Sequence, residues 1–397
     1  MSTPHYFQIV VAGLMLMNVA LKADAPAVPG FEQARLAAVP ERMRQFVREK
    51  QIAGSVTLVA TRDRFVQLDA VGQADIGSGA PMKVDSIFWI ASMTKPITAA
   101  AVLMLQDEGK LSIDDLAAKY LPELAELKGP GGRPAKVTLK QMLTHTSGMV
   151  PEAPNRVLRN AKSLADLVPV YAIAPMQLEP GTKWAYCQSG INSLGRIVEV
   201  VSGKSLPDFF QERIFEPLGM KDTAFYPSEE QAKRIAKSYR RVGEELQETP
   251  VFVLQGHAAT DRNRYPAANG GLYSTAADYG RFCQLLLNEG TLDGHRLLRP
   301  ETVKMMRTIQ TGELKTGFSA GNGWGLGVCV VRQPQGVTAM LSPGAFGHGG
   351  AYGTQAWIDP VKGVVYVLMV QRADFANSDD SAVRKGFQKA AAAAIQK

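Results

Sequence analysis

Ser92 and Lys95 are the two residues whose types and spacing first suggest chemistry. They lie in segment 90–96 (IASMTKP), directly before the apolar run 97–105. Pro96 falls in a first helical turn, where its missing N–H removes no intrahelical bond, so the pattern predicts a helix beginning at or just before Ser92. Residues three apart share a helix face, which predicts the Lys95 amine within hydrogen-bond reach of the Ser92 hydroxyl. Such a pair is a nucleophile with its base beside it.

A serine before a helix and a lysine in its first turn also have a plain structural explanation. Ser92 would then cap the helix, and Lys95 would be a solvated charge. Two observations favour catalysis. No other serine in the chain is followed three residues later by lysine, and Lys95 lies at the start of an almost wholly apolar helix. We therefore expect Lys95 to be partly buried, which lowers the pKa of a lysine and suits it to act as a base near neutral pH.

A second candidate group lies in segment 180–190 (PGTKWAYCQSG), which is typical of a loop leading into a helix. Amphipathic packing is one explanation for its aromatic residues Trp184 and Tyr186. In a catalytic role, Tyr186 points at Ser92. A phenol held as phenolate by Lys95 then takes the serine proton and later returns it to the leaving alcohol.

Segment 346–353 (FGHGGAYG) places four glycines on a predicted strand. Glycine weakens a strand unless a ligand or another backbone approaches closely, so this segment suits the wall of a cleft. One of its backbone N–H groups is then available to stabilise an oxyanion. For His348, packing or solvation explains the residue as well as a catalytic role does.

The elements that must position these groups change type along the chain. Both ends are rich in predicted strands, whereas the middle carries apolar residues at helical spacing. This order predicts an α/β two-lobed fold, in which both chain ends form an antiparallel sheet flanked by helices and an all-helical lobe is inserted between them. The site is expected in the cleft between the lobes.

We place the α/β lobe at about 26–90 and 290–397 and the helical lobe at about 91–289, within one catalytic unit over 26–397. The periodicity predicts strands over 55–61, 65–72, 325–331, 351–358 and 364–370, and helices over 31–50 with an interruption near Pro40, 113–120, 139–144, 191–201, 206–215, 276–287, 299–308 and 382–395.

Composition narrows the classes of function. Of the 397 residues, 46% are hydrophobic and 20% are charged, which is typical of a globular protein with a sizeable core. The net charge of +7 comes from basic residues interleaved with acidic ones, which argues against nucleic-acid binding. Three widely spaced cysteines and five scattered histidines indicate no disulfide framework and no metal site. We expect no cofactor and a small-molecule substrate; the sequence leaves the oligomeric state open.

The N-terminal residues 1–25 are ambiguous. Residues 7–21 form an apolar stretch of signal-peptide length, followed by a small-residue site at 23–25, but no lysine or arginine precedes it. The segment fits either a cleaved signal or a short apolar helix packed on the domain. Cleavage would place the protein in the periplasm or outside the cell, and otherwise it would be cytoplasmic. The stretch is too short and too polar at its edges for stable membrane insertion.

Taken in order, segment 92–95 (SMTK), the Tyr186 loop and segment 348–350 (HGG) resemble the three motifs of the serine β-lactamase and penicillin-binding-protein superfamily. The specific resemblance is to the class C-like family VIII carboxylesterases, and it covers the chain from about Phe31 to the C-terminus. Supporting matches lie at 143–148 (LTHTSG), 217–220 (PLGM) and 270–278 (GGLYSTAAD). The resemblance implies a serine β-lactamase-like fold.

The resemblance also implies roles for individual residues. Ser92 is the implied acylated nucleophile, Lys95 and Tyr186 are the implied proton-transfer pair, and the N–H groups of Ser92 and Ala351 are the implied oxyanion hole. The implied substrate-binding residues are Gln188, His348, Gly349 and Gly350.

Two departures from the family pattern bear on the substrate. β-Lactamases carry Lys-Thr-Gly in the third motif, whose lysine helps to hold a substrate carboxylate, whereas His348 provides no fixed positive charge at neutral pH. The usual Tyr-x-Asn is Tyr-Cys-Gln over 186–188, and Gln188 can still donate and accept hydrogen bonds. The resemblance therefore implies a carboxylesterase for short-chain esters, with weak promiscuous β-lactamase activity as an accompanying possibility.

Several alternatives stay open. Amide cleavage, as in D-amino-acid peptidases of this fold, and acyl transfer to an acceptor other than water use the same chemistry. The alternative from another class is a non-catalytic binding protein that kept the fold. A rival nucleophile, Ser319, lies in segment 317–321 (GFSAG), which overlaps 315–317 (KTG). No strand precedes it and no helix follows, so we interpret this stretch as a flexible loop near the cleft.

Overall fold

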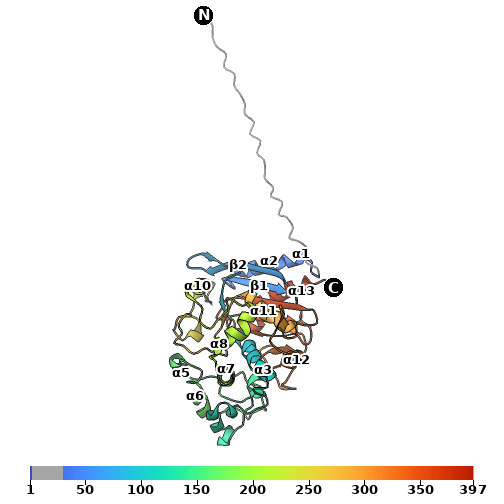
Figure 1. Cartoon of the computed structure of the whole chain (residues 1–397). Coiled ribbons are helices and arrows are strands. Elements are labelled where there is room, and N and C mark those ends of the chain that lie inside the picture. The colour runs from blue at the N-terminus through green and yellow to red at the C-terminus, as the bar shows by residue number, and fades with distance from the viewer. Residues whose placement is uncertain (2–29, 397) are drawn as a thin grey trace.

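The computed structural model of the protein describes Met1 and residues 30–396. Among these residues an eight-stranded sheet forms the centre, with the strand order β10-β11-β12-β13-β14-β1-β2-β3. Its neighbouring strands are antiparallel and come from both ends of the chain, as the sequence predicts (Figure 1). The strands are β1 (Gly54–Ala60), β2 (Phe65–Asp75), β3 (Ala80–Pro81), β10 (Asn322–Trp324), β11 (Cys329–Val331), β12 (Phe346–Gly349), β13 (Gln355–Asp359) and β14 (Val364–Met369).

The central strands are apolar along their length because both faces of the sheet are covered. In β14, Val365 and Val367 belong to one hydrophobic core, whereas Val364 and Tyr366 belong to a second. Successive side chains of a strand point to opposite faces, so one apolar run serves two cores.

Helices from the two chain ends cover one face of the sheet. The helices α1 (Gln33–Leu36), α2 (Ala38–Arg48) and α13 (Ala382–Ala393) pack against one another there, close together in Figure 1. The opposite face is covered by α11 (Ala276–Leu287), which contacts β1, β13 and β14. The division of the chain into two lobes stays a prediction. Helix α11, which falls within the range predicted for the helical lobe, packs on the sheet.

The regular secondary structure between β4 (Phe88–Trp89) and α11 is mainly helical, but the segment is not all-helical as predicted, because β5 (Tyr239–Val242) and β6 (Glu245–Glu248) form a hairpin within it. Its central helix, α3 (Thr94–Asp107), has no charged residue between Lys95 and Asp107, is buried from Thr94 to Leu105, and packs against α7 (Gln188–Ser202). A helix that is apolar all round needs such burial. The other helices are α4 (Leu139–Leu143), α5 (Asn155–Asn160), α6 (Val168–Ile173), α8 (Leu206–Phe210), α9 (Glu216–Leu218), α10 (Glu229–Ala232) and, later in the chain, α12 (Pro300–Met306).

Two of the predicted helices differ from the structure. Segment 113–120 forms only a 3₁₀ turn over Ala117–Lys119, because its backbone bonds to the segment 137–140 instead. Ala117 N donates to the Val137 carbonyl oxygen, and the Ile113 carbonyl oxygen accepts from Lys140 N, so these groups are not available to a regular helix. The interruption predicted near Pro40 lies at Ala37 instead, since proline is tolerated in the first turn of α2.

Two of the predicted strands are shorter than expected. The strand predicted over 351–358 begins only at Gln355, because Gly353 N donates to the Gly350 carbonyl oxygen at 3.0 Å and closes a turn. The strand predicted over 325–331 begins at Cys329, since Gly325 N bonds to the Val328 carbonyl oxygen in another turn.

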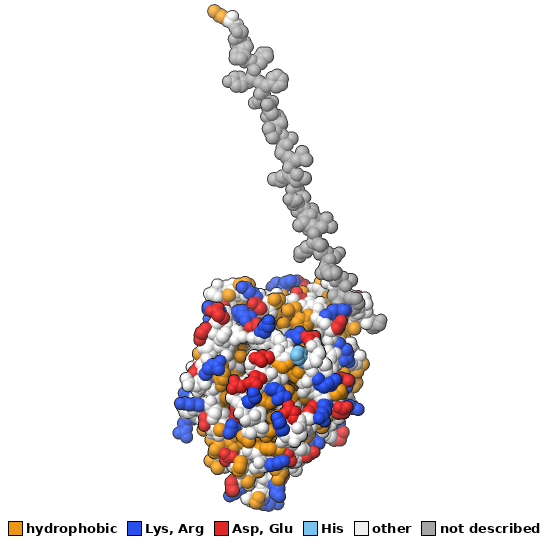
Figure 2. All heavy atoms as spheres, viewed as in Figure 1, with side chains coloured by type: hydrophobic (Ala, Val, Ile, Leu, Met, Phe, Trp, Pro, Cys, Tyr) orange, Lys and Arg blue, Asp and Glu red, His pale blue; other side chains and the backbone are white. Residues whose placement is uncertain are grey.

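The surface follows the interleaved charge of the sequence. Figure 2 shows acidic and basic side chains interspersed over one face of the molecule. The prediction for segment 1–25 lies outside the described residues, apart from Met1. Within residues 30–396, no helix has both the length and the apolar character needed to cross a bilayer.

Candidate active site

Ser92 lies in a tight turn between a short strand and the buried helix. Strand β4 pairs with β7 (Tyr273–Ser274), and a 3₁₀ turn over Ala91–Met93 continues directly into α3. Ala91 has a φ of 47°, a left-handed conformation that is unusual for a residue other than glycine. The helix predicted at Ser92 is therefore present, with a tightened and strained first turn.

Hydrogen bonds from neighbouring elements hold this turn. Trp89 Nε1 donates to the Gly270 carbonyl oxygen at 2.6 Å, and the Tyr279 hydroxyl of α11 donates to the Met93 carbonyl oxygen at 2.8 Å. The side chain of Gln371 donates to the Trp89 carbonyl oxygen at 2.8 Å. Support from several elements fixes the nucleophile in one position.

Lys95 follows Ser92 by one helical turn and is fully buried. Its Nζ lies 3.1 Å from Ser92 Oγ and donates to the Asn269 carbonyl oxygen at 2.7 Å. The predicted contact is present, and the burial is complete rather than partial. Desolvation lowers the pKa of Lys95 to about 7, against the opposing attraction of Glu152 and Cys187. Near neutral pH, much of Lys95 is therefore an uncharged amine that can accept a proton.

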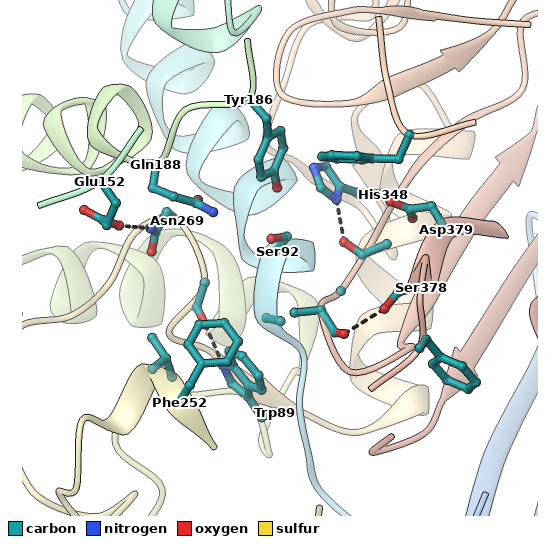
Figure 3. A pocket seen from close by; sticks show the side chains of 18 of the residues that line it. Trp89, Ser92, Glu152, Tyr186, Gln188, Phe252, Asn269, His348, Ser378 and Asp379 are labelled. Carbon is teal, nitrogen blue, oxygen red and sulfur yellow. Dashed lines mark hydrogen bonds between the residues drawn. The ribbon is translucent and has the colours of Figure 1, made fainter. Parts of the chain in front are cut away.

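Tyr186 reaches the same hydroxyl from a different element. It precedes α7, whose N-terminus is capped by Cys187 Sγ accepting from Gly190 N at 3.4 Å. Figure 3 shows the Tyr186 hydroxyl pointing towards Ser92, whose side chain influences the pKa of the phenol. Lys95 Nζ lies 4.7 Å from the centre of the Tyr186 ring. The three side chains therefore meet around one hydroxyl group.

The prediction that Lys95 holds Tyr186 as a phenolate is wrong. Desolvation raises the pKa of Tyr186 well above its usual range, and the neighbouring Ser92 hydroxyl offsets only part of this. A phenolate in a buried site lacks the water that stabilises its charge in solution. The resting tyrosine is a neutral phenol, which makes Lys95 the better proton acceptor and Tyr186 the better proton donor.

The end of β12 packs against the nucleophile turn. A side chain on Gly350 would place its Cβ 2.7 Å from the Ile90 carbonyl oxygen, so glycine permits the close approach. The Gly350 carbonyl accepts from Gly353 N, which turns the Ala351 N–H of the same trans peptide the opposite way. Within the described chain, neither the Ser92 nor the Ala351 N–H donates to a protein acceptor. Both are open to an oxyanion.

His348 is buried on β12 and uncharged. Its Nδ1 lies 2.7 Å from the Gly349 carbonyl oxygen, which assigns the ring proton to Nδ1. Desolvation, together with the nearby Lys95, lowers the pKa of His348 to about 3. Its ring also packs edge to face on Trp324, with centroids 5.5 Å apart. This position thus provides no positive charge near neutral pH, in agreement with the sequence.

The catalytic groups open into a cavity of about 530 Å³. Gln188 lies in its wall, and its Oε1 has no protein partner. Trp89 and Phe252 form an aromatic wall with ring centroids 5.0 Å apart. The cavity therefore combines an apolar surface with a few polar groups, as small-molecule sites do.

Several polar residues of the wall are missing from the sequence predictions, among them Glu152, Asn269 and Asp379. Asn269 directly precedes the 270–278 match, and Glu152 follows the 143–148 match by four residues. Proximity to those matches is the signal that points to them. Asp379 lies after the last strand and has no such marker.

The rival nucleophile Ser319 has no catalytic partner. Its hydroxyl donates to the backbone oxygen of Asp379 at 3.3 Å, and no lysine, histidine or tyrosine in the described chain hydrogen bonds to it. The neighbouring Phe318 lines the cavity, with its ring centroid 5.0 Å from that of Tyr186. The interpretation of this stretch as a loop near the cleft is confirmed.

Comparison along the whole chain decides the family. Residues 39–391 match the family model described as Beta-lactamase. The chain belongs to the β-lactamase family. Its relatives in that family include Esterase EstB from Burkholderia gladioli, which is 30% identical over 378 residues, covering 86% of this chain and 90% of that protein. The predicted resemblance to family VIII carboxylesterases is thereby confirmed.

Other members of the β-lactamase family are similarly related. Penicillin-binding protein 4 from Amycolatopsis lactamdurans is 32% identical, with 83% of each chain covered. A putative D-alanyl-D-alanine carboxypeptidase from Escherichia coli (strain K12) is 28% identical, with 88% of this chain and 85% of that protein covered. Esterase and peptidase relatives agree with a serine hydrolase.

A solved structure supports the fold. EstCE1, a hydrolase with promiscuous acyltransferase activity, superposes with a TM-score of 0.77 at 24% identity, covering 91% of this chain and 98% of that one. The predicted β-lactamase-like α/β architecture is therefore confirmed for this β-lactamase-family protein.

Proposed function

We propose that this β-lactamase-family protein is a serine carboxylesterase that hydrolyses short-chain carboxylic esters through an acyl-enzyme on Ser92. One observation carries the proposal: the Ser92 hydroxyl lies between the Lys95 amine and the Tyr186 phenol, at the base of a cavity. A nucleophile next to a base and an acid has what two successive acyl transfers require.

The first half-reaction forms the acyl-enzyme. Uncharged Lys95 takes the Ser92 proton while Ser92 Oγ attacks the ester carbonyl carbon. The N–H groups of Ser92 and Ala351 stabilise the resulting oxyanion. When the carbon–oxygen bond to the alcohol breaks, Tyr186 donates its proton to the leaving oxygen, and protonated Lys95 restores the phenol proton.

The second half-reaction returns Ser92. A water molecule attacks the acyl carbon and gives up a proton to Lys95, which is again uncharged. Collapse of the second tetrahedral intermediate breaks the bond to Ser92 Oγ, and this oxygen regains a proton through the Lys95–Tyr186 pair. The products are an alcohol and a carboxylic acid.

The charges of the cavity favour esters over β-lactams. His348 is neutral, and no lysine or arginine is among the cavity-lining residues of the described chain. A substrate carboxylate therefore lacks a fixed positive partner and is held poorly. The proposal accordingly limits β-lactam hydrolysis to a weak side activity.

The test is turnover of p-nitrophenyl butyrate together with intact-protein mass spectrometry during turnover. We expect nitrophenol release and a butyryl mass increment that peptide mapping assigns to Ser92. A Ser319→Ala variant should behave as the native protein does. Hydrolysis without any acyl adduct on Ser92, or its loss in Ser319→Ala, would refute the assignment.

The pH dependence of activity provides a separate prediction. Because Lys95 must be uncharged to accept the Ser92 proton and its pKa is about 7, kcat/KM should fall about tenfold per pH unit below about pH 7. Above that value the profile should be level, because burial keeps the Tyr186 phenol protonated. Initial rates on p-nitrophenyl butyrate, with circular dichroism at each pH, measure this. A profile level down to about pH 5 would contradict Lys95 as the base.

A further inference from the structure

Glu152 is a buried carboxylate in the wall of the active-site cavity. Its Oε1 accepts from the Tyr171 hydroxyl at 2.8 Å and from Ala153 N at 2.9 Å. Its Oε2 accepts only from the Asn269 side-chain amide at 2.9 Å. Figure 3 shows this bond at the edge of the cavity, with Glu152 and Asp379 on opposite sides of Ser92. One Glu152 oxygen thus retains hydrogen-bonding capacity beside the space where substrate enters.

This carboxylate has no ion-pair partner in the described chain. No lysine, arginine or histidine nitrogen there lies within 4.0 Å of Glu152. The cationic group that influences its pKa is Lys95, whose amine is committed to Ser92 and Asn269. Buried carboxylates are normally paired, because desolvation strongly penalises an isolated charge. Glu152 therefore lacks the counter-ion that its burial calls for.

The second acidic residue of the cavity, Asp379, differs from Glu152 in the cation that influences it. Asp379 is influenced by the buried guanidinium of Arg384, which also donates to the Asp379 carbonyl oxygen. Its carboxylate accepts in addition from the Gln355 amide at 3.1 Å. Neither carboxylate forms an ion pair in the described chain. Asp379 is influenced by an arginine that stays charged near neutral pH, whereas the cation that influences Glu152 is Lys95, which is charged in only part of the molecules there.

The surroundings of Glu152 suit a cation. The lining of the same cavity includes the aromatic residues Tyr265, Trp89 and Phe252, and aromatic faces attract organic ammonium groups. With a pKa of about 7, Lys95 is charged in only part of the molecules near neutral pH, so it competes only in part for the Glu152 charge. An anionic substrate group placed here would instead meet a like charge at low dielectric.

We propose that Glu152 is the counter-ion for a cationic group of the substrate, so that the enzyme prefers esters bearing an ammonium group. This inference rests on the proposed ester hydrolysis and adds the charge class of the substrate. The ammonium group lies against the Glu152 carboxylate while the ester carbonyl lies at Ser92.

Glu152 has an alternative role that the test must separate from this one. Its bond to the Asn269 side chain steadies a residue whose carbonyl oxygen holds Lys95. If that were its whole role, replacing Glu152 would slow every substrate by the same factor. A counter-ion instead changes the ratio between charged and neutral substrates of the same shape.

Two isosteric ester pairs measure that ratio. Butyrylcholine and 3,3-dimethylbutyl butyrate differ by a quaternary nitrogen in the alcohol, and the p-nitrophenyl esters of 4-trimethylammoniobutyric acid and 5,5-dimethylhexanoic acid differ in the same way in the acyl chain. In at least one pair we expect kcat/KM to be about tenfold or more higher for the cation. The preference should fall to about one in Glu152→Gln, and it should persist in Glu152→Asp and in the matched charge removal Asp379→Asn.

Two results with the ester pairs would contradict the counter-ion role of Glu152. Equal rates within both pairs for the native protein, or an equal loss on cation and neutral ester in Glu152→Gln, would overturn the proposal. Calorimetric binding of the same pairs to Ser92→Ala tests the counter-ion without catalysis, with tighter binding of the cation expected. Cation preference in binding but no hydrolysis of any ester by the native protein would refute the proposed function and leave the Glu152 site standing.

Discussion

Replacing Ser92 by alanine is expected to lower kcat on p-nitrophenyl butyrate by about 10⁴-fold or more, because no acyl-enzyme can form. The oxyanion N–H groups and the cavity persist, so a small residual rate above water is expected. Ser92 lines an existing cavity and accepts from Lys95, so removing its hydroxyl leaves the packing of α3 unchanged. Steady-state kinetics and thermal unfolding of the two proteins measure both effects.

The matched control for this substitution is Ser319→Ala. Ser319 also donates one hydrogen bond, to the Asp379 carbonyl oxygen, but it has no base beside it. Its removal should leave kcat within about twofold, as surface-loop changes generally do. Near-native turnover by Ser92→Ala would remove the basis of the mechanism.

The second large effect is expected for Lys95→Met, which should reduce kcat/KM by about 10³- to 10⁴-fold by removing the general base. Methionine preserves an unbranched apolar side chain within the core. It also leaves the Asn269 carbonyl oxygen without the Lys95 donor, a loss that opposes the gain in stability from removing a buried amine, and thermal unfolding measures the net effect. Rates measured well below the unfolding temperature separate the two effects.

A Lys95→Arg variant distinguishes a base from a fixed charge. Arginine stays protonated at the pH of any enzyme assay and cannot accept the Ser92 proton. We therefore expect it to be as inactive as Lys95→Met. Substantial activity in Lys95→Arg would mean that the position supplies positive charge rather than proton transfer.

The sequence predicts the Ser92–Lys95 contact well because helix geometry alone brings residues three apart together. Tyr186 is different, since nothing local relates it to Ser92. Its place was predictable only because three motifs resemble one superfamily in their order and spacing. The same motifs identified the glycine-rich end of β12, where close backbone approach demands residues without side chains.

The incorrect and missing predictions share one physical cause: they concern groups that only the folded chain brings together. The phenolate prediction for Tyr186 considered its cationic neighbour but not the desolvation that dominates its pKa. Glu152 and Asn269 enter the site through contacts between segments far apart in the chain, and the sequence marks them only by their proximity to the matches at 143–148 and 270–278. Segment 113–120 failed as a helix because its backbone groups bond to residues 137–140, a contact that apolar spacing does not reveal.

The strands of the sheet could be predicted from their apolar runs, but these runs do not define where each strand begins and ends. Runs such as β14 are apolar on both faces, which indicates a covered central strand. The turns within the 351–358 and 325–331 segments depend on glycine backbone conformations, and the spacing of apolar residues does not indicate these turns. Strand ends were therefore less well predicted than strand positions.

The complete burial of Lys95 has a consequence for when charge appears during turnover. Near neutral pH, the free enzyme can hold serine, amine and phenol all in their uncharged forms. Separated charges then arise only as the serine oxygen bonds to carbon. At that point the Lys95 ammonium and the substrate oxyanion form within the same buried site. The site therefore stabilises an ion pair that exists only in the transition state and the tetrahedral intermediate. The resting, uncharged site receives no such stabilisation.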